Sequence, residues 1–390
     1  MSAEQDPFRP DFDLTEAIDA ARAAPTIEAF RATRFCLKRG DDFDRWAGAI
    51  RTGSGASPKE RDAPRPARPE DPIRLVHWNI EQGKAWERIL AAIDADPRLG
   101  RADLWTVNEV DVGTARAGNR NVVIDLAARL DFFWVYAACY VELLGRNRVG
   151  LHGLALLSRW PLVDPGAAPL PDCFDYFGFP EEKRLGARRI LWATVAHPSG
   201  PFRIATTHLE VRNDPACRAR QMKAALDALP AGSCWFTGDW NSHTFRRGTV
   251  GRSFREFLRL QTVSAREIDR QLLAPWEREP LFGEVERAGF DFLRYHDGRP
   301  TARQRLSGVE EIERLPRRLR APARRLLRLE ARTLRMRLDW IAARGPWEPA
   351  GPGAAWTGTA HGPEENAASD HAPIGVAAQR TDFAEASPVS

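Results

Sequence analysis

Lysine is scarce in this 390-residue chain: only five of its 57 basic residues are lysines, so the other 52 are arginines. Because 53 acidic residues leave a net charge of only +4, the composition excludes a protein whose binding rests on bulk positive charge. Arginine suits bidentate contacts to phosphate or carboxylate. A GC-rich coding sequence would produce the same arginine excess, and we weight that explanation more heavily.

Cysteine is also rare, and long hydrophobic runs are absent. The five cysteines, at positions 36, 139, 173, 217 and 234, are odd in number and contain no C-x-x-C pair, which argues against a disulfide framework and a zinc knuckle. We therefore expect reduced thiols and a cytoplasmic location. The N-terminus lacks a basic segment followed by an apolar run, and no stretch of about eighteen apolar residues occurs, so we expect neither export nor an integral membrane segment.

Hydrophobic residues make up 43% of the chain, with 13 Trp and 19 Phe, as in a globular protein with a large core. The apolar positions between residues 14 and 50 follow helical spacing and predict a helical N-terminal appendage, residues 1–50. Residues 51–72 are rich in Gly, Ser, Pro and charge, which predicts a linker. The main domain is expected to span residues 73–380, with a tail at 381–390.

Short apolar runs bounded by polar residues predict the strands of that domain: Ile73–Trp78, Leu104–Val107, Phe132–Val141, Leu151–Leu157, Ile190–Ala196, Phe202–Thr206, Cys234–Thr237, Leu338–Ala342 and Pro373–Ala377. Helical segments such as Trp86–Ile93 and Ala216–Leu229 separate some of them, whereas other runs are joined by short turns. This pattern predicts an α/β fold with two mixed sheets packed together. Residues 264–337 are long, charged and rich in Arg, and they read as a mostly helical insertion.

Polar side chains follow these runs at the point where each run ends: Asn79 and Glu81, Glu109 and Asp111, His208 and Glu210, Asp239 and Asn241, Asp339, then Asp370 and His371. A strand that ends in a polar residue places it at one edge of a sheet, where loops converge. Each case alone is weak, but their recurrence predicts one shared polar site. Glu210 and Asp111 are left open, either as buried partners of that site or as solvated strand ends.

The residue types fit metal-assisted phosphoryl chemistry. Glu109 and Glu81 offer the oxygen ligands that Mg²⁺ prefers. Asp239 and Asn241 could deprotonate and orient a nucleophilic water. A histidine held by a carboxylate can place positive charge beside the phosphate oxygens or protonate a leaving oxygen, and the sequence offers four residues for that arrangement: His371, His208, Asp339 and Asp370.

Seven motifs, in order, resemble the endonuclease/exonuclease/phosphatase (DNase I-like) superfamily: Trp78-Asn-Ile-Glu81, Val107-Asn-Glu-Val110, Gly153-Leu-Ala-Leu-Leu-Ser-Arg-Trp-Pro161, Thr206-Thr-His-Leu-Glu210, Gly238-Asp-Trp-Asn241, Arg337-Leu-Asp-Trp-Ile341 and Ser369-Asp-His371. The resemblance covers about residues 73 to 378, without the N-terminal appendage and most of 264–335. It implies a four-layer α/β sandwich with two central sheets.

The resemblance also implies roles for individual residues. Glu109 is expected to be the principal Mg²⁺ ligand, with Asn79 and Glu81 lining the same pocket. Asp239 and Asn241 would act on the water. The remaining roles concern histidines and their partners: His371 at the scissile phosphate with Asp339 as its carboxylate, Asp370 near the metal or orienting His371, and His208 near the leaving group.

Two residues depart from the motifs of the superfamily: Asn108 stands where Gln usually precedes the metal Glu, and Trp240 replaces the commoner Phe or Leu. Neither change removes a catalytic group, so they bear on substrate fit. A separate feature is the segment 314–337, which carries ten Arg and one Glu. Such a run is usually a solvated face, and the alternative is contact with an anionic substrate.

We therefore predict a hydrolase that uses Mg²⁺, or alternatively Mn²⁺, and cleaves a phosphodiester by attack of an Asp-activated water. The expected substrate is nucleic acid or a related phosphodiester. The alternative is a phospholipid or inositol-phosphate hydrolase, resembling sphingomyelinases or 5-phosphatases, and a more remote one is a non-catalytic scaffold. Nothing in the sequence identifies a protein partner.

Overall fold

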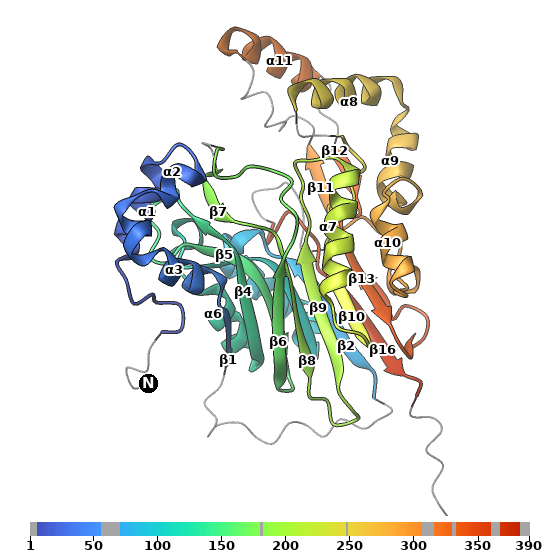
Figure 1. The fold of residues 1–390 in the computed structure, drawn as a ribbon. Helices are drawn as coiled ribbons and strands as arrows, with labels where there is room; N and C mark the ends of the chain where they lie inside the picture. Colours follow the sequence, from blue (N-terminus) through green and yellow to red (C-terminus); the bar gives the residue numbers. More distant parts are fainter. Residues whose placement is uncertain are drawn as a thin grey trace, which may run out of the picture.

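Two β-sheets packed face to face form the centre of the computed structural model (Figure 1), which describes residues 6–55, 71–179, 182–246, 249–305, 316–329, 333–359 and 367–382. The larger sheet has nine strands, in the order β1 (Ile50–Ser54), β4 (Phe133–Glu142), β5 (Leu151–Ser158), β3 (Leu104–Val112), β2 (Ile73–Asn79), β16 (Ile374–Arg380) and β14 (Trp347–Pro349), with β7 (Arg184–Gly186) on β4 and β15 (Ala355–Thr357) on β16. The smaller sheet has five strands, in the order β13 (Asp339–Arg344), β10 (Cys234–Asp239), β9 (Phe202–His208), β8 (Arg189–Val195) and β6 (Leu162–Pro169). A separate ribbon pairs β11 (Ala302–Arg305) with β12 (Thr333–Met336).

Helices cover the outer face of each sheet. The larger sheet is covered by α1 (Leu14–Ala23), α2 (Ile27–Arg31), α3 (Arg34–Gly48), α4 (Trp86–Ala95), α5 (Pro97–Gly100) and α6 (Val122–Leu130). The smaller sheet is covered by α7 (Pro215–Ala228) and α10 (Leu281–Arg287). The predicted four-layer α/β sandwich with two packed mixed sheets is therefore confirmed. No helix in these described ranges is both long and apolar enough to cross a membrane.

Side-chain alternation on the strands builds three apolar layers. On β2, Val76 and Trp78 pack under the helices of the larger sheet, whereas Leu75 points the other way, between the sheets. On β10, Phe236 packs against α7 and α10, and Trp235 lies between the sheets. Because side chains on a strand alternate between the two faces, every second residue of these strands belongs to the layer between the sheets.

The N-terminal helices share the core of the larger sheet. Phe8 stacks on Trp134 of β4, with ring centroids 5.9 Å apart, and Arg51 on β1 donates to the carbonyl of Pro7. The division into residues 1–50, 51–72, 73–380 and 381–390 stays a prediction. Parts of that division, residues 1–5, 56–70 and 383–390, lie outside the described residues.

The predicted insertion contains both helices and a ribbon. It holds α9 (Ala265–Leu273), α10, the two strands β11 and β12, and α11 (Arg317–Leu329), while α8 (Val250–Thr262) precedes it. Leu334 and Met336 on β12 are buried against Ile268 and Leu272 of α9, so the ribbon has a small core of its own. Residues 306–315 and 330–332 lie outside the described part of the chain.

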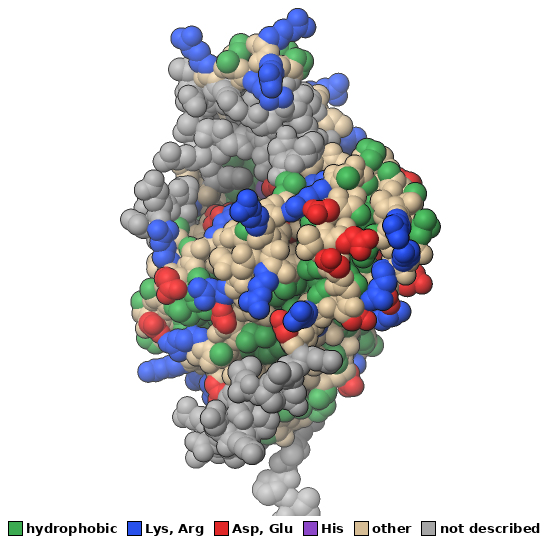
Figure 2. Space-filling model, turned by 90° about the vertical axis from the view of Figure 1, so that its left-hand side faces the viewer, with side chains coloured by type: hydrophobic (Ala, Val, Ile, Leu, Met, Phe, Trp, Pro, Cys, Tyr) green, Lys and Arg blue, Asp and Glu red, His purple; other side chains and the backbone are tan. Residues whose placement is uncertain are grey.

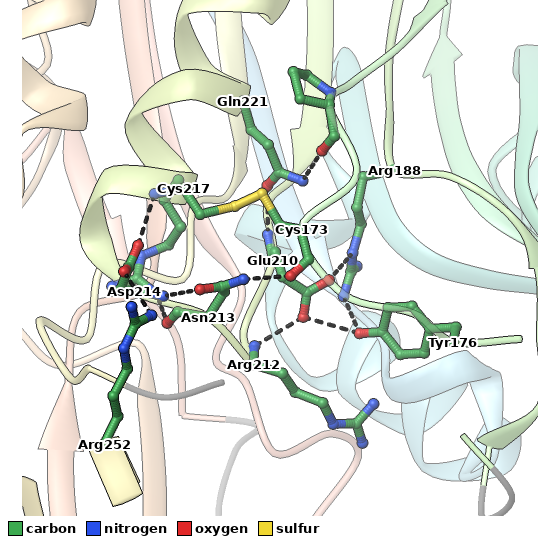
Figure 3. The surroundings of a disulfide bond; sticks show 12 residues. Cys173, Tyr176, Arg188, Glu210, Arg212, Asn213, Asp214, Cys217, Gln221 and Arg252 are labelled. Carbon is green, nitrogen blue, oxygen red and sulfur yellow. Dashed lines mark hydrogen bonds and ion pairs between the residues drawn. A yellow bond between two sulfur atoms is a disulfide. The ribbon is translucent and has the colours of Figure 1, made fainter. Parts of the chain in front are cut away.

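A disulfide joins Cys173 to Cys217, so the expectation of five reduced thiols is wrong for these two residues (Figure 3). The two Cα atoms lie 6.2 Å apart, within the range of a disulfide. The loop before β7 lies against the first half of α7, where Gln221 donates to the carbonyl of Pro171 at 3.0 Å. The bond escaped prediction because 44 residues separate the two cysteines and no short spacing marks them.

Removing this disulfide should destabilise the fold. Because the bond closes a loop of 44 residues, loss of denatured-state constraint should lower the free energy of unfolding by about 2–4 kcal/mol in the double variant Cys173→Ser/Cys217→Ser. Urea unfolding followed by tryptophan fluorescence measures the change. A reductant should produce the same loss in the parent protein and none in the variant, and Cys36→Ser, at a half-buried free cysteine, serves as the control.

Candidate active site

The candidate site lies where the layer between the two sheets changes from apolar to polar. Along β2 the inward row runs Leu75, His77, Asn79, and along β9 it runs Ile204, Thr206, His208. Along β10 it ends at Asp239, whose register partners are His208 on β9 and Asp339 on β13. The same alternation that buries the core therefore brings the polar ends of four strands together.

Asp239 is the centre of the hydrogen-bond network. Its carboxylate accepts from the side-chain amide of Asn79 at 3.1 Å and from the backbone N–H of Asn241 at 3.0 Å. The Nε2 atom of His208 lies 3.3 Å from Oδ2 of Asp239, and Nε2 of His371 lies 3.8 Å from the same oxygen. All five side chains belong to the predicted catalytic set, and all are buried.

His371 and Asp339 form the predicted imidazole–carboxylate pair. Nδ1 of His371 lies 2.7 Å from Oδ2 of Asp339, which is only 1% exposed. Burial acts against the charge of both groups, yet their mutual attraction raises the pKa of His371 well above its ordinary range and lowers the pKa of Asp339. His371 is therefore a protonated imidazole at neutral pH, held by an ionised carboxylate.

The pKa values of His208 and Asp239 shift in the directions opposite to those of His371 and Asp339. Burial lowers the pKa of His208, with the positive charge of Arg188 adding to the shift, so this imidazole is neutral at pH 7. Burial also raises the pKa of Asp239 to about 7, with the nearby charge of Asp339 acting in the same direction. A carboxyl group that titrates near neutral pH is suited to accept a proton from water.

The predicted metal residues line the neighbouring part of the site. Glu109 accepts a hydrogen bond from Gln82, and its Oε1 lies 4.0 Å from Nδ1 of His208. Desolvation together with the charges of Glu109 and Glu81 raises the pKa of Asp370 to about 6. Carboxylates that repel one another in this way favour a bound cation, and an all-oxygen donor set fits Mg²⁺ or Mn²⁺.

A second arrangement of ligand atoms also lies in the site. Asp239, Asp339 and His371 each offer one ligand atom, and these three atoms lie within 4.8 Å of one another. Nδ1 of His371 is bonded to Asp339, which leaves Nε2 as the imidazole atom of this second group. The all-oxygen group of Glu109, Glu81 and Asp370 stays the predicted metal site.

Backbone strain concentrates at the same place. Glu81, Gln82, Glu109 and Asn241 adopt positive φ angles of 47°, 61°, 54° and 48°, and they are half of the eight non-glycine residues with positive φ among those described. The pairing of β3 with β5 shifts register between Val107 and Val110, and this bulge redirects the side chain of Glu109. Strained conformations of this kind persist where the surroundings fix them, which is typical of active sites.

Both residues that depart from the motifs, Asn108 and Trp240, have structural roles. Asn108 is fully buried and links the two sheets, because its amide donates to Thr206 at 3.0 Å and its Oδ1 accepts from the backbone N–H of Asp239. Trp240 is also fully buried and stacks on Trp340 with centroids 5.9 Å apart. Gly238, two residues before Trp240, approaches β9 so closely that a Cβ atom would lie 2.0 Å from the carbonyl oxygen of Thr207.

The two residues left open by the sequence, Glu210 and Asp111, are buried partners. Glu210 accepts from the hydroxyl of Tyr176 at 3.0 Å, and Nε of Arg188 lies 3.5 Å away (Figure 3). Asp111 forms an ion pair with Arg116 at 2.6 Å, and its Oδ1 lies 2.8 Å from Nδ1 of His152. Desolvation acts to raise the pKa of Glu109, but the positive charges of His152, His371, Arg184 and Arg188 hold it below its usual range.

His77 is a site residue that the sequence analysis missed. It is fully buried, its Nδ1 lies 3.0 Å from the hydroxyl of Thr106, and its Nε2 lies 3.5 Å from Oδ1 of Asp339. Asp339 therefore lies between two histidines. The sequence feature that could have identified His77 is the alternation of side chains along β2, which puts His77 on the same face as Asn79.

Replacing His77 should impair turnover through Asp339. In His77→Leu, Oδ1 of Asp339 loses the imidazole nitrogen that lies 3.5 Å away, and we expect kcat to fall about tenfold to a hundredfold with little change in KM. His77→Gln keeps an N–H donor near the same place and should recover most of the loss. Steady-state kinetics on both variants measure this, and equal defects in the two would mean that His77 serves packing alone.

One of three comparisons with known proteins finds a family match over most of the chain. The model of the Endonuclease/Exonuclease/phosphatase family matches residues 76–371, which include every predicted site residue. The chain belongs to this family. Members of the family hydrolyse phosphodiester or phosphate esters and generally depend on a divalent metal.

Several solved structures are similar to this chain at low sequence identity. An endonuclease/exonuclease/phosphatase from Beutenbergia cavernae DSM 12333 is 18% identical, with a TM-score of 0.48, and the match covers 80% of this chain and 72% of that protein. The human Nocturnin catalytic domain with bound sulfate is 15% identical, with a TM-score of 0.44 and coverages of 86% and 99%. D. rerio TDP2 complexed with single strand DNA product is 14% identical, with a TM-score of 0.43 and coverages of 79% and 99%. A comparison with curated proteins finds no match.

Proposed function

We propose that the protein is a Mg²⁺-dependent phosphodiester hydrolase, with Mn²⁺ as an alternative metal, and that nucleic acid or a related phosphodiester is its substrate. The observation that carries the proposal is Asp239, buried at the junction of the two sheets with amide and imidazole groups of four residues around its carboxylate. This arrangement can hold a water molecule and take its proton. The membership of the chain in a family of phosphoester hydrolases supports the same chemistry.

The residues divide the reaction between them. Asp239 accepts the proton of the attacking water, and Asn241, whose amide is fixed by a 2.9 Å bond to the carbonyl of Leu209, orients that water. Protonated His371, held by Asp339, contacts a phosphate oxygen and stabilises the charge that grows there in the transition state. His208 lies on the side of the leaving group. Water then forms the new P–O bond as the bond to the leaving oxygen breaks, in line with it.

Glu109, Glu81 and Asp370, with Asn79 beside them, would hold the cation. When bound, the metal neutralises phosphate charge and lowers the barrier to attack. Desolvation raises the pKa of Asp370 to about 6 and the charges of Glu109 and Glu81 add to that shift, which supports this assignment.

A screen of substrate classes tests the proposal. Purified protein with Mg²⁺ is assayed on DNA, RNA, abasic DNA, sphingomyelin and inositol phosphates, with an Asp239→Asn variant as the background control. We expect turnover of a nucleic acid that the variant lacks. Turnover of sphingomyelin or inositol phosphate alone would assign the second candidate, a phospholipid or inositol-phosphate hydrolase, which the apolar side chains exposed on α8 favour. No turnover on any class would favour a non-catalytic scaffold.

A cytoplasmic location is also proposed. The free cysteines Cys36, Cys139 and Cys234 agree with it. The disulfide between Cys173 and Cys217 weighs against it, since stable disulfides are rare in reducing compartments.

A further inference from the structure

Helix α8 exposes apolar side chains and turns a carboxylate inward. Phe254 and Leu258, one helical turn apart, are 56% and 47% exposed, whereas Glu256 is only 8% exposed. Glu256 pairs with Arg259 at 2.5 Å, and Arg259 reaches Gln271 on α9 at 3.2 Å, so this polar side of α8 faces the protein. A helix that packed on the core with its apolar face would show the opposite pattern.

Helix α11 also exposes an apolar side chain, and it carries more positive charge than α8. Its sequence between residues 317 and 329 contains six Arg and no acidic residue. Arg317, Arg318 and Arg325 are exposed, and between them Leu319 is 48% exposed. Figure 2 shows arginine side chains with hydrophobic side chains between them at the upper end of the molecule, where Figure 1 places α11.

These two helices stand out from the rest of the surface. Three of the eight large hydrophobic side chains that are exposed among the described residues lie on α8 and α11. Both helices lie at the upper end of Figure 1, toward which the strand ends of the candidate site point. Arg252 of α8 also pairs with Asp214, at the start of α7, at 3.2 Å. The exposed side chains of Phe254, Leu258 and Leu319 and the exposed arginines of α8 and α11 are together called the α8/α11 surface below.

We propose that the α8/α11 surface docks on a membrane that contains anionic phospholipid. Exposed Phe and Leu side chains gain free energy by entering the boundary between headgroups and acyl chains, and each arginine is attracted to the negative surface of the leaflet. Nucleic acid would satisfy the arginines but leave Leu258 and Leu319 in water. A second copy of the chain is disfavoured because docking the two surfaces would bring their arginines together.

Sedimentation of the full-length protein with vesicles tests the proposal without measuring turnover. We expect binding to vesicles of phosphatidylcholine with phosphatidylserine, much weaker binding to phosphatidylcholine alone, and weaker binding as salt is raised. The variant Arg317→Gln/Arg318→Gln/Arg325→Gln should bind about a hundredfold more weakly, at about fivefold per arginine. The variant Phe254→Ser/Leu258→Ser should lose about tenfold.

Matched control variants test whether vesicle binding depends on this surface or on exposed charge and hydrophobicity anywhere on the protein. Arg45→Gln/Arg287→Gln/Arg299→Gln removes the same charge from side chains that are 74%, 68% and 69% exposed elsewhere, and Leu37→Ser removes a leucine that is 77% exposed. Both controls should bind vesicles within about twofold of the parent protein.

Two outcomes would overturn the proposal. One is binding that does not distinguish anionic from neutral vesicles or that survives both surface variants. The other is absent vesicle binding combined with weaker DNA binding in the arginine variant, which would make this a nucleic-acid surface. Asp239→Asn should bind vesicles like the parent protein, so that failure of the catalytic proposal leaves this test intact.

Discussion

Asp239→Asn should reduce kcat by roughly 10²- to 10⁴-fold, because it removes the group that accepts the proton of the attacking water. The substitution keeps the size of the side chain and one acceptor oxygen, so one of the two hydrogen bonds is retained, either that from Asn79 to Oδ2 or that from the backbone N–H of Asn241 to Oδ1. KM should change little, since the lost interaction belongs to the transition state. Steady-state kinetics measure both constants, and Asp227→Asn, at an exposed residue paired with Lys223, is the matched control.

The effect of Asp239→Asn on stability should have the opposite sign. Burial raises the pKa of Asp239 from 3.8 to about 7, so between these values the folded protein binds a proton that the unfolded chain has lost. Folding stability from this group therefore falls as pH rises from about 4 through about 7. The Asn side chain cannot ionise, so the Tm of the variant in chelator at pH 8 should equal or exceed that of the parent protein. A lower Tm with unchanged kcat would make Asp239 a structural residue.

The same reasoning extends to three other residues. His371→Ala, Asn241→Ala and Glu109→Ala should each lower kcat by orders of magnitude in a folded protein. Circular dichroism checks the fold. Near-normal turnover in His371→Ala would contradict the assignment of its imidazole to the phosphate.

The strands that carry the site could be predicted because each is a buried apolar run with a polar residue at its end. All nine predicted runs form strands, with ends that differ by a few residues. The edge strand β6 was missed because Pro165 and Pro169 interrupt it, and such residues are tolerated only where one side of a strand has no partner. The short strands β14 and β15 gave no periodic signal, since three residues show no alternation.

The contacts within the site were harder to predict than the residues that belong to it. The sequence alone indicated that Asp239, His208 and Asp339 gather at one edge, because that follows from strand ends. Strand alternation could have placed His77 on the same face as Asn79, but the sequence contained no signal that His77 borders Asp339 or that Cys173 meets Cys217, because both contacts depend on how segments far apart in sequence pack. Trp240 likewise shows that a motif residue beside a catalytic group can belong wholly to the core.

Removing divalent metal should abolish activity, and Mg²⁺ or Mn²⁺ should restore it. The predicted ligands Glu109, Glu81 and Asp370 offer only oxygen atoms, which suit these ions and lack the sulfur or multiple imidazoles typical of zinc. Dialysis against EDTA followed by addition of each metal measures the dependence. Full activity in chelator would contradict the metal assignment.

Metal binding should also be visible without any substrate. Because the carboxylates of Glu109 and Glu81 help raise the pKa of Asp370 to about 6, a cation among them would lower that pKa and release protons. Calorimetry at pH 6 in buffers of different ionisation enthalpy should therefore report proton release on Mg²⁺ binding, and release should fall as pH rises above 7. Glu109→Gln should weaken Mg²⁺ binding because it removes the principal ligand charge, whereas Glu87→Gln, at an exposed residue on α4 (83% exposed side chain), should leave the titration unchanged. Mg²⁺ binding of equal strength in these two variants would place the metal elsewhere, for example at the group formed by Asp239, Asp339 and His371.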